Sequence, residues 1–195
     1  MDRRWFLAAI SSAGVATTVG CSVVGGSKTL SEPTVHTESS GRRSLSFTSK
    51  GTEIGSLGVT GTVTSEGIDL ETELWHRRDT AVRSITLEFW MPPRGTDSGT
   101  AVAVVSPVEG DSSPPPSVSL SSPRHESGSI VEIDDLDDLA DETINTLEFI
   151  VRPGSETATT LVIDGRIELA SGAWFGSDYT LDGRLRLDFP ALRNQ

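Results

Sequence analysis

The chain has 195 residues, of which 16 are basic and 28 acidic, so its formal net charge is −12. A surface this acidic repels nucleic-acid phosphates and anionic lipid headgroups, which excludes both from the expected partners. Hydrophobic residues make up 35% of the chain and gather in short runs, enough for the core of one domain once targeting and linker segments are set aside.

The first twenty residues have the layout of an export signal. Two adjacent arginines precede a weakly apolar run over residues 5–19, which is shorter than the ~20 strongly apolar residues of a membrane-spanning helix. The two arginines and the first three residues of the run read RRWFL, which resembles the twin-arginine (Tat) export motif. The resemblance implies the Tat translocase as a partner during export and a domain that crosses the membrane already folded. The motif positions are Arg3, Arg4, Phe6 and Leu7.

The only cysteine, Cys21, follows the string Thr-Val-Gly, which resembles a lipobox, the signal for lipid attachment and cleavage just before the cysteine. We therefore expect a signal peptide over residues 1–20 and a lipid on Cys21 that anchors the protein at the extracellular face of the cell membrane. A free thiol or an intermolecular disulfide is the alternative. Together with an acidic composition that includes only two lysines, the two motifs resemble the Tat-exported lipoproteins of halophilic archaea.

Residues 21–42 have the composition of a flexible tether. They are rich in Ser, Thr and Gly and show no sustained apolar period, as in linkers. His36 lies in this segment, and because no second candidate ligand is near it in sequence, we expect no metal there.

The period of the apolar residues becomes two in the remaining segment, residues 43–192. Leu57, Val59 and Val63, for example, alternate with Gly and Thr, which predicts strands with one buried face. About ten such strands predict an all-β fold, a two-sheet antiparallel β-sandwich of immunoglobulin-like or jelly-roll-like type. The spacing of Leu136, Leu139 and Ala140 predicts one short amphipathic helix over residues 134–144.

Four turns are predicted between these strands. Gly, Asp and charged residues favour tight turns at residues 65–67 and 77–79. Asp-Gly pairs at residues 164–165 and 182–183 predict two hairpins, because Asp-Gly supplies the positive φ angles that two-residue turns need.

Few residues carry recognisable chemistry. The acid cluster within residues 134–142 lacks the spacing of an EF-hand, which favours a solvated acidic face over a calcium site. No catalytic or metal motif surrounds His76 or His125. We therefore expect no catalytic residue, no metal and no cofactor.

Two tryptophans are the candidate ligand-binding residues. Trp75 and Trp90 fall out of phase with the apolar residues of their strands, which predicts positions on the outer sheet faces, where exposed tryptophan suits a surface protein or a glycan. Coverage by another element is the alternative interpretation.

The expected function is display of a non-enzymatic β-sandwich, for binding or for envelope structure, on the cell surface. The alternative is a surface-anchored hydrolase that acts on an extracellular polymer. A buried histidine–carboxylate pair in a cleft would favour the hydrolase, and an aromatic patch would favour binding.

Overall fold

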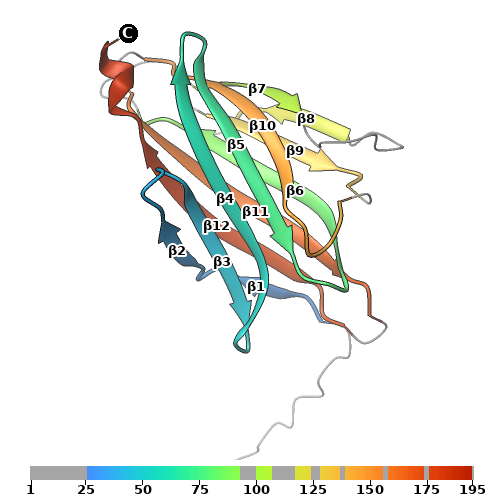
Figure 1. Ribbon diagram of the computed structural model, residues 1–195. Coiled ribbons are helices and arrows are strands. Elements are labelled where there is room, and N and C mark those ends of the chain that lie inside the picture. Colours follow the sequence, from blue (N-terminus) through green and yellow to red (C-terminus); the bar gives the residue numbers. More distant parts are fainter. Residues whose placement is uncertain are drawn as a thin grey trace, which may run out of the picture.

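Two six-stranded sheets packed face to face form the body of the protein (Figure 1). The computed structural model describes residues 26–92, 100–106, 117–123, 128–136, 139–155, 158–173 and 176–194. Across these residues, no helix has both the length and the apolar character needed to cross a bilayer. The described residues do not include the predicted export-signal positions, the predicted lipid-attachment residue or one of the histidines, namely Arg3, Arg4, Phe6, Leu7, Cys21 and His125.

The first sheet has the strand order β1-β12-β11-β6-β9-β8. Only β1 and β12 run parallel, and every other neighbouring pair is antiparallel. The strands are β1 (Lys28–Leu30), β12 (Tyr179–Asp188), β11 (Thr160–Ser171), β6 (Thr80–Trp90), β9 (Ser129–Asp134) and β8 (Ser117–Ser121).

The second sheet has the strand order β2-β3-β4-β5-β10-β7 and is antiparallel throughout. A short 3-10 helix, η1 (Pro190–Asn194), follows the last strand of the first sheet. Together the sheets confirm the predicted antiparallel β-sandwich. The strands are β2 (Thr34–Thr37), β3 (Arg43–Ser49), β4 (Thr52–Thr64), β5 (Gly67–His76), β10 (Asn145–Arg152) and β7 (Ala101–Ser106).

The alternating apolar residues meet between the sheets, as the period of two predicts. Leu57 and Val59 of β4 are fully buried, and so are Leu87 and Phe89 of β6 in the facing sheet. The rings of Phe89 and Phe149 lie 5.2 Å apart between centroids at an angle of 52°, a tilted arrangement that aromatic pairs favour.

The two Asp-Gly pairs do not form hairpins, contrary to the prediction. Both lie inside long strands, where Gly165 of β11 is directly opposite Gly183 of β12. Neither glycine has a positive φ, whereas the turn between β3 and β4 has positive φ angles of 52° at Lys50 and 78° at Gly51. The glycines are needed for packing instead, since a Cβ at Gly165 would lie 2.7 Å from Cδ2 of Leu57 in the other sheet.

Three other expectations also differ from the structure. β1 and β2 both lie within residues 21–42, so much of the predicted tether belongs to the sandwich. Asp134 ends β9, and the described residues of 135–144 form a loop rather than a helix, in which Leu136 and Leu139 are buried but Ala140 is exposed. Of the two tight turns, residues 65–66 close the β4–β5 hairpin, whereas residues 77–79 connect β5 to β6 and so cross between sheets.

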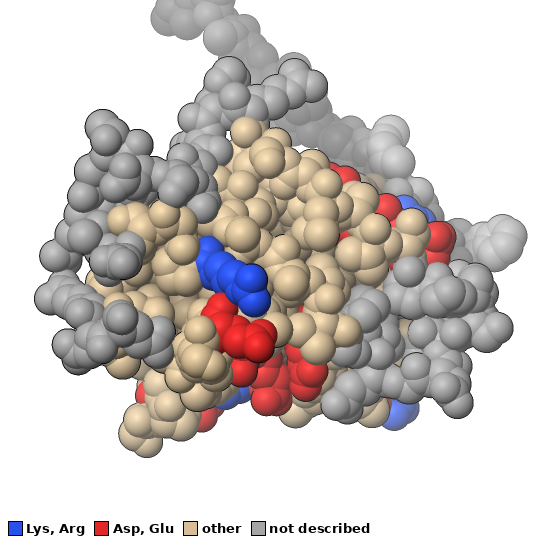
Figure 2. Space-filling view, turned by 90° about the horizontal axis from the view of Figure 1, so that it is seen from above, with Lys and Arg blue, Asp and Glu red and all other residues tan. Residues whose placement is uncertain are grey.

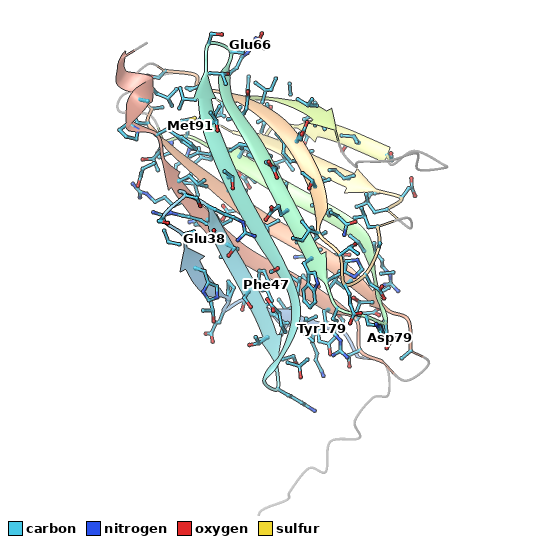
Figure 3. All side chains as sticks on the ribbon, in the orientation of Figure 1. Glu38, Phe47, Glu66, Asp79, Met91 and Tyr179 are labelled. Carbon is cyan, nitrogen blue, oxygen red and sulfur yellow. The ribbon has the colours of Figure 1, made fainter. Side chains whose placement is uncertain are left out.

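The sandwich has two distinct ends. Figure 3 places Glu66 at one end and Asp79 and Tyr179 at the other. The described chain enters at the Tyr179 end, where Lys28 pairs with Tyr179. Viewed from the opposite end, basic and acidic side chains lie next to one another within a largely uncharged surface (Figure 2).

Candidate functional site

The outer face of the second sheet carries a ladder of polar side chains. Along β5 the chain alternates between buried residues and the outward-facing Asp69, Glu71, Glu73 and Trp75. Trp75 thus lies on the outer face, as its phase predicted, and is partly exposed. This sheet face is the candidate functional site.

Trp90 also lies on an outer face, but on the other sheet. It is the last residue of β6, and its cross-strand neighbour Val162 is 6% exposed. The two tryptophans therefore occupy opposite sides of the sandwich and do not form one aromatic patch.

A hollow of 220 Å³ surrounds one edge of Trp75, and we call it the Trp75 pocket. Ser56 is directly opposite Trp75 in the β4–β5 pairing, and Ile144, which is 63% exposed, adds an apolar side chain from the loop before β10. The pocket thus combines an indole, an aliphatic group, a hydroxyl, a cation and two carboxylates. Its lining residues are Arg42, Glu53, Ser56, Glu73, Trp75 and Ile144.

Arg42 is held in place by two carboxylates. Its Nε donates to Glu73 Oε2 at 2.8 Å, its Nη2 donates to the same oxygen at 2.5 Å, and its Nη1 donates to Glu38 Oε1 at 2.7 Å. The hydrogen bonds to Glu73 raise the pKa of Arg42 above its ordinary value, and burial opposes them. Gly58 lies beneath the guanidinium, since a Cβ there would be 2.6 Å from Nη2. Figure 3 shows Glu38 beside β2, at the margin of the sheet.

A second hollow of 380 Å³ lies further along the same face, between β4, β5, β10 and β7. Glu71 and Glu148 are directly opposite each other in the β5–β10 pairing and both line it, together with Thr60, Thr62 and Val105. Two carboxylates on adjacent strands are a possible acid–base pair by position.

His76, the last residue of β5, is completely buried. The hydroxyl of Thr80 donates to the carbonyl of Arg77 at 2.7 Å, so its oxygen accepts from Nδ1–H of His76 at 3.0 Å. Nε2 is then unprotonated, and it has no hydrogen-bond partner among the described residues. Burial lowers the pKa of His76. A hydrogen bond with the backbone of Arg77 and the negative charge of Asp141 raise this pKa, but they do not outweigh burial. A substrate cannot reach this ring, which therefore does not supply the histidine in a cleft that the hydrolase alternative needs.

The acidic loop after β9 covers the end of the sandwich near His76. The amide of Glu142 donates to the carbonyl of His76 at 2.8 Å, and its carboxylate pairs with Arg78 at 2.6 Å. The amide of Asp79 donates to Asp141 at 3.3 Å. Within the described part of the chain, no three His, Cys, Asp or Glu side chains gather in a way that could hold a metal ion; Asp137 and Asp138 lie outside it.

Sequence reasoning identified Trp75 but not its neighbours in the pocket. Arg42 was the last residue of the predicted tether, and Ile144 was part of the predicted helix. The alternation of β5 was a usable signal for Glu73, because residues two apart in a strand share a face. No local signal brings Arg42 or Glu53 to that face, since the β3–β4 hairpin places them.

The solved structures to which this chain was matched are distant in sequence. The yeast delta-COP-I mu-homology domain is 12% identical, with a TM-score of 0.38 over 69% of this chain and 54% of that chain. The collagen-binding domain from a Staphylococcus aureus adhesin is 11% identical, with a TM-score of 0.31 over 71% of this chain and 100% of that chain. A structure of manganese lipoxygenase of Gaeumannomyces graminis with partial zonadhesin of Komagataella pastoris is 12% identical. Its TM-score is 0.34 over 75% of this chain and 55% of that chain. This chain thus spans about half the length of the first of these structures.

Comparison with curated proteins finds no match. One family model matches residues 27–191, a range that begins just before β1 and ends within η1. Because this match covers most of the sequence, the chain belongs to the family described as Domain of unknown function (DUF8121).

Proposed function

We propose that this chain is a lipid-anchored protein of the extracellular face of the cell membrane and that its β-sandwich serves as a binding domain. The observation that carries the binding function is the Trp75 pocket, where an aromatic ring, a fixed cation and two carboxylates converge on an open sheet face. Ligand sites characteristically combine an apolar surface with a few positioned polar groups.

The position of β1 supports an anchored arrangement close to the membrane. Lys28 is seven positions after Cys21, a distance of at most about 25 Å for an extended chain. A lipid on Cys21 would hold the Tyr179 end of the sandwich nearest the membrane and leave its long outer faces open to ligands.

The surface hydrolase remains the second candidate, and one observation favours it. Glu71 and Glu148 face each other beside the larger hollow, and paired carboxylates are the catalytic groups of most glycoside hydrolases. Hydrolysis of an added polysaccharide by the purified protein, abolished by Glu148→Gln, would establish this candidate over simple binding.

Anchoring is tested by a Cys21→Ser variant in the native host. We expect the wild-type protein in the membrane fraction, with a mature mass that lacks residues 1–20 and includes lipid. The variant should appear in the medium or as an uncleaved precursor, because two long acyl or alkyl chains are needed for stable attachment.

A second variant separates export from anchoring. Replacing Arg3 and Arg4 together by Lys should leave the precursor inside the cell. Membrane attachment of Cys21→Ser at the normal mature size would contradict the lipid anchor, and normal export of the double-lysine variant would contradict the Tat route.

A further inference from the structure

We propose that the Trp75 pocket binds a neutral sugar ring, an inference that rests on the binding function proposed above and names its ligand class. The pocket has a volume of 220 Å³ and presents two kinds of surface to a ligand. A pyranose presents the same two kinds, with apolar C–H groups on the faces of its ring and hydroxyl groups around its rim.

The apolar part of the pocket comes from Trp75 and Ile144. Trp75 is partly exposed on the sheet face, and Ile144 is 63% exposed beside it. Burying the accessible parts of these two apolar side chains under a ligand is favourable. The C–H face of a sugar ring fits such a surface without placing its hydroxyl groups against carbon.

The charges of the pocket favour a ligand that can both donate and accept hydrogen bonds. Arg42 lies between Glu38 and Glu73, and Glu53 adds a further carboxylate to the lining. The carboxylates outnumber the one guanidinium, so an anion would be repelled. A simple cation could approach the carboxylates but would offer no acceptor to Arg42 or Ser56. A neutral polyhydroxylated ligand can instead donate to the carboxylates and accept from Arg42 or Ser56.

These polar groups are already positioned. Arg42 makes three hydrogen bonds to carboxylates, and Glu53 Oε1 accepts from the hydroxyl of Ser46 at 2.6 Å. Ser56 and Trp75 lie on paired strands of the sheet. Because the side chains need little reordering when a ligand binds, the entropy cost of recognition is low. Charge-assisted hydrogen bonds from hydroxyl groups to carboxylates are also stronger than neutral ones.

The test uses the full-length protein purified in a detergent without a sugar headgroup. The neutral probes are the methyl glycosides of glucose, mannose and galactose; the anionic probe is methyl glucuronide and the cationic probe is tetramethylammonium. Saturation-transfer NMR detects contact, and calorimetric titration gives the affinity. We expect at least one neutral glycoside to bind more tightly than either charged probe.

Tryptophan variants locate the site. Trp75→Ala should weaken binding of that glycoside by about tenfold or more, since it removes the aromatic surface of the pocket. Trp90→Ala is the matched control, because Trp90 occupies the outer face of the other sheet, and it should bind as the wild type does. Glu53→Gln removes a charge without removing a side chain and should also weaken binding, which keeps the test valid if Trp75→Ala folds poorly.

Three results would overturn the proposal: no neutral glycoside binds, a charged probe binds more tightly, or Trp90→Ala loses as much affinity as Trp75→Ala. These results would leave the anchoring experiment on Cys21 unaffected. Conversely, sugar binding with an unmodified Cys21 would support the pocket and reject the anchor.

Discussion

The ring of His76 has a side-chain hydrogen bond at Nδ1 but, in the described part of the chain, none at Nε2. Nδ1–H donates to Thr80, whereas Nε2 is buried without a partner among the described residues. A neutral ring tolerates this arrangement because an unpaired acceptor costs about 1–3 kcal/mol, while a buried charge costs more. The charged groups around it belong to the turn after β5, namely Arg77, Arg78 and Asp79, and to the loop that carries Asp141 and Glu142.

We predict that stability falls as the pH is lowered past the ordinary pKa of histidine. Burial depresses the pKa of His76 in the folded state below its value in the unfolded chain, so the unfolded chain binds the proton more readily. The stability that the neutral His76 contributes is therefore fully present above about pH 6.5. It is lost as the pH falls towards the pKa of His76 in the folded state. Each unit of depression corresponds to about 1.4 kcal/mol. Urea unfolding between pH 8 and pH 5 measures the slope.

Two variants isolate the contribution of His76 from that of the many carboxylates. His76→Asn keeps a donor near Thr80 but cannot titrate, so its free energy of unfolding should change less between pH 8 and pH 5 than that of the wild type. His36→Asn, which removes the exposed histidine of β2, is the matched control for the loss of an imidazole. Equal slopes for His76→Asn and the wild type would contradict the prediction.

At the scale of elements, glycines decide how closely the sheets approach. Gly165 and Gly183 lie on the inner face of the first sheet against Leu57 and Leu45, and a Cβ at either glycine would lie 2.7 Å from the facing leucine. Interiors are packed at crystal-like density, so the buried leucines have nowhere to move. Gly58 is on the outer face, and there the nearest atoms belong to the guanidinium of Arg42, whose side chain is 28% exposed.

This contrast predicts different outcomes for the same substitution. Gly165→Ala should lower the free energy of unfolding by about 1–3 kcal/mol through overpacking. Gly58→Ala should cost less stability, because Arg42 can move away, but it should weaken glycoside binding by displacing the guanidinium. Chemical unfolding and calorimetric titration of both variants give the comparison; a larger loss of stability for Gly58→Ala would contradict it.

The prediction from sequence succeeded where the signal is local and failed where it depends on the other sheet. Alternation is a property of one strand, so it predicted the β-sandwich, the burial of Leu57 and Val59, and the outward positions of Trp75 and Trp90. The Asp-Gly pairs were misassigned because their glycines are needed for packing against leucines of the other sheet, which lie more than one hundred positions away in sequence. Arg42 was missed for a similar reason, since its partner Glu73 is 31 residues further along the chain.

At the scale of the whole molecule, the excess of acidic groups opposes folding. With 28 acidic and 16 basic residues, compaction brings like charges together. Carboxylates follow one another along the face of β5 at Asp69, Glu71 and Glu73, with Glu148 beside them. Ion pairs such as Arg184 with Asp164 join exposed side chains and each contributes at most about 1 kcal/mol. Repulsion should therefore dominate the response to salt.

We predict that KCl stabilises the protein. Raising the concentration from about 0.1 M to about 1 M shortens the screening length from roughly 10 Å to roughly 3 Å, which weakens repulsion between carboxylates more than it weakens the few surface ion pairs. A gain of about 1 kcal/mol would raise the melting temperature by roughly 2–4 °C for a chain of this size. Thermal unfolding followed by circular dichroism across this range measures the shift.

A triple variant tests whether screening of the acidic face causes the gain. Asp69→Asn, Glu71→Gln and Glu148→Gln together remove three like charges from neighbouring positions of β5 and β10, so the variant should be more stable than the wild type at low salt and should gain less from KCl. An equal gain in both proteins would mean that salt acts through hydration of the whole surface and that the charges of this face do not limit stability. A melting temperature that falls with KCl would show instead that attraction in the ion pairs outweighs repulsion between carboxylates. Screening of the acidic surface would then give no reason to expect a protein that is adapted to high salt.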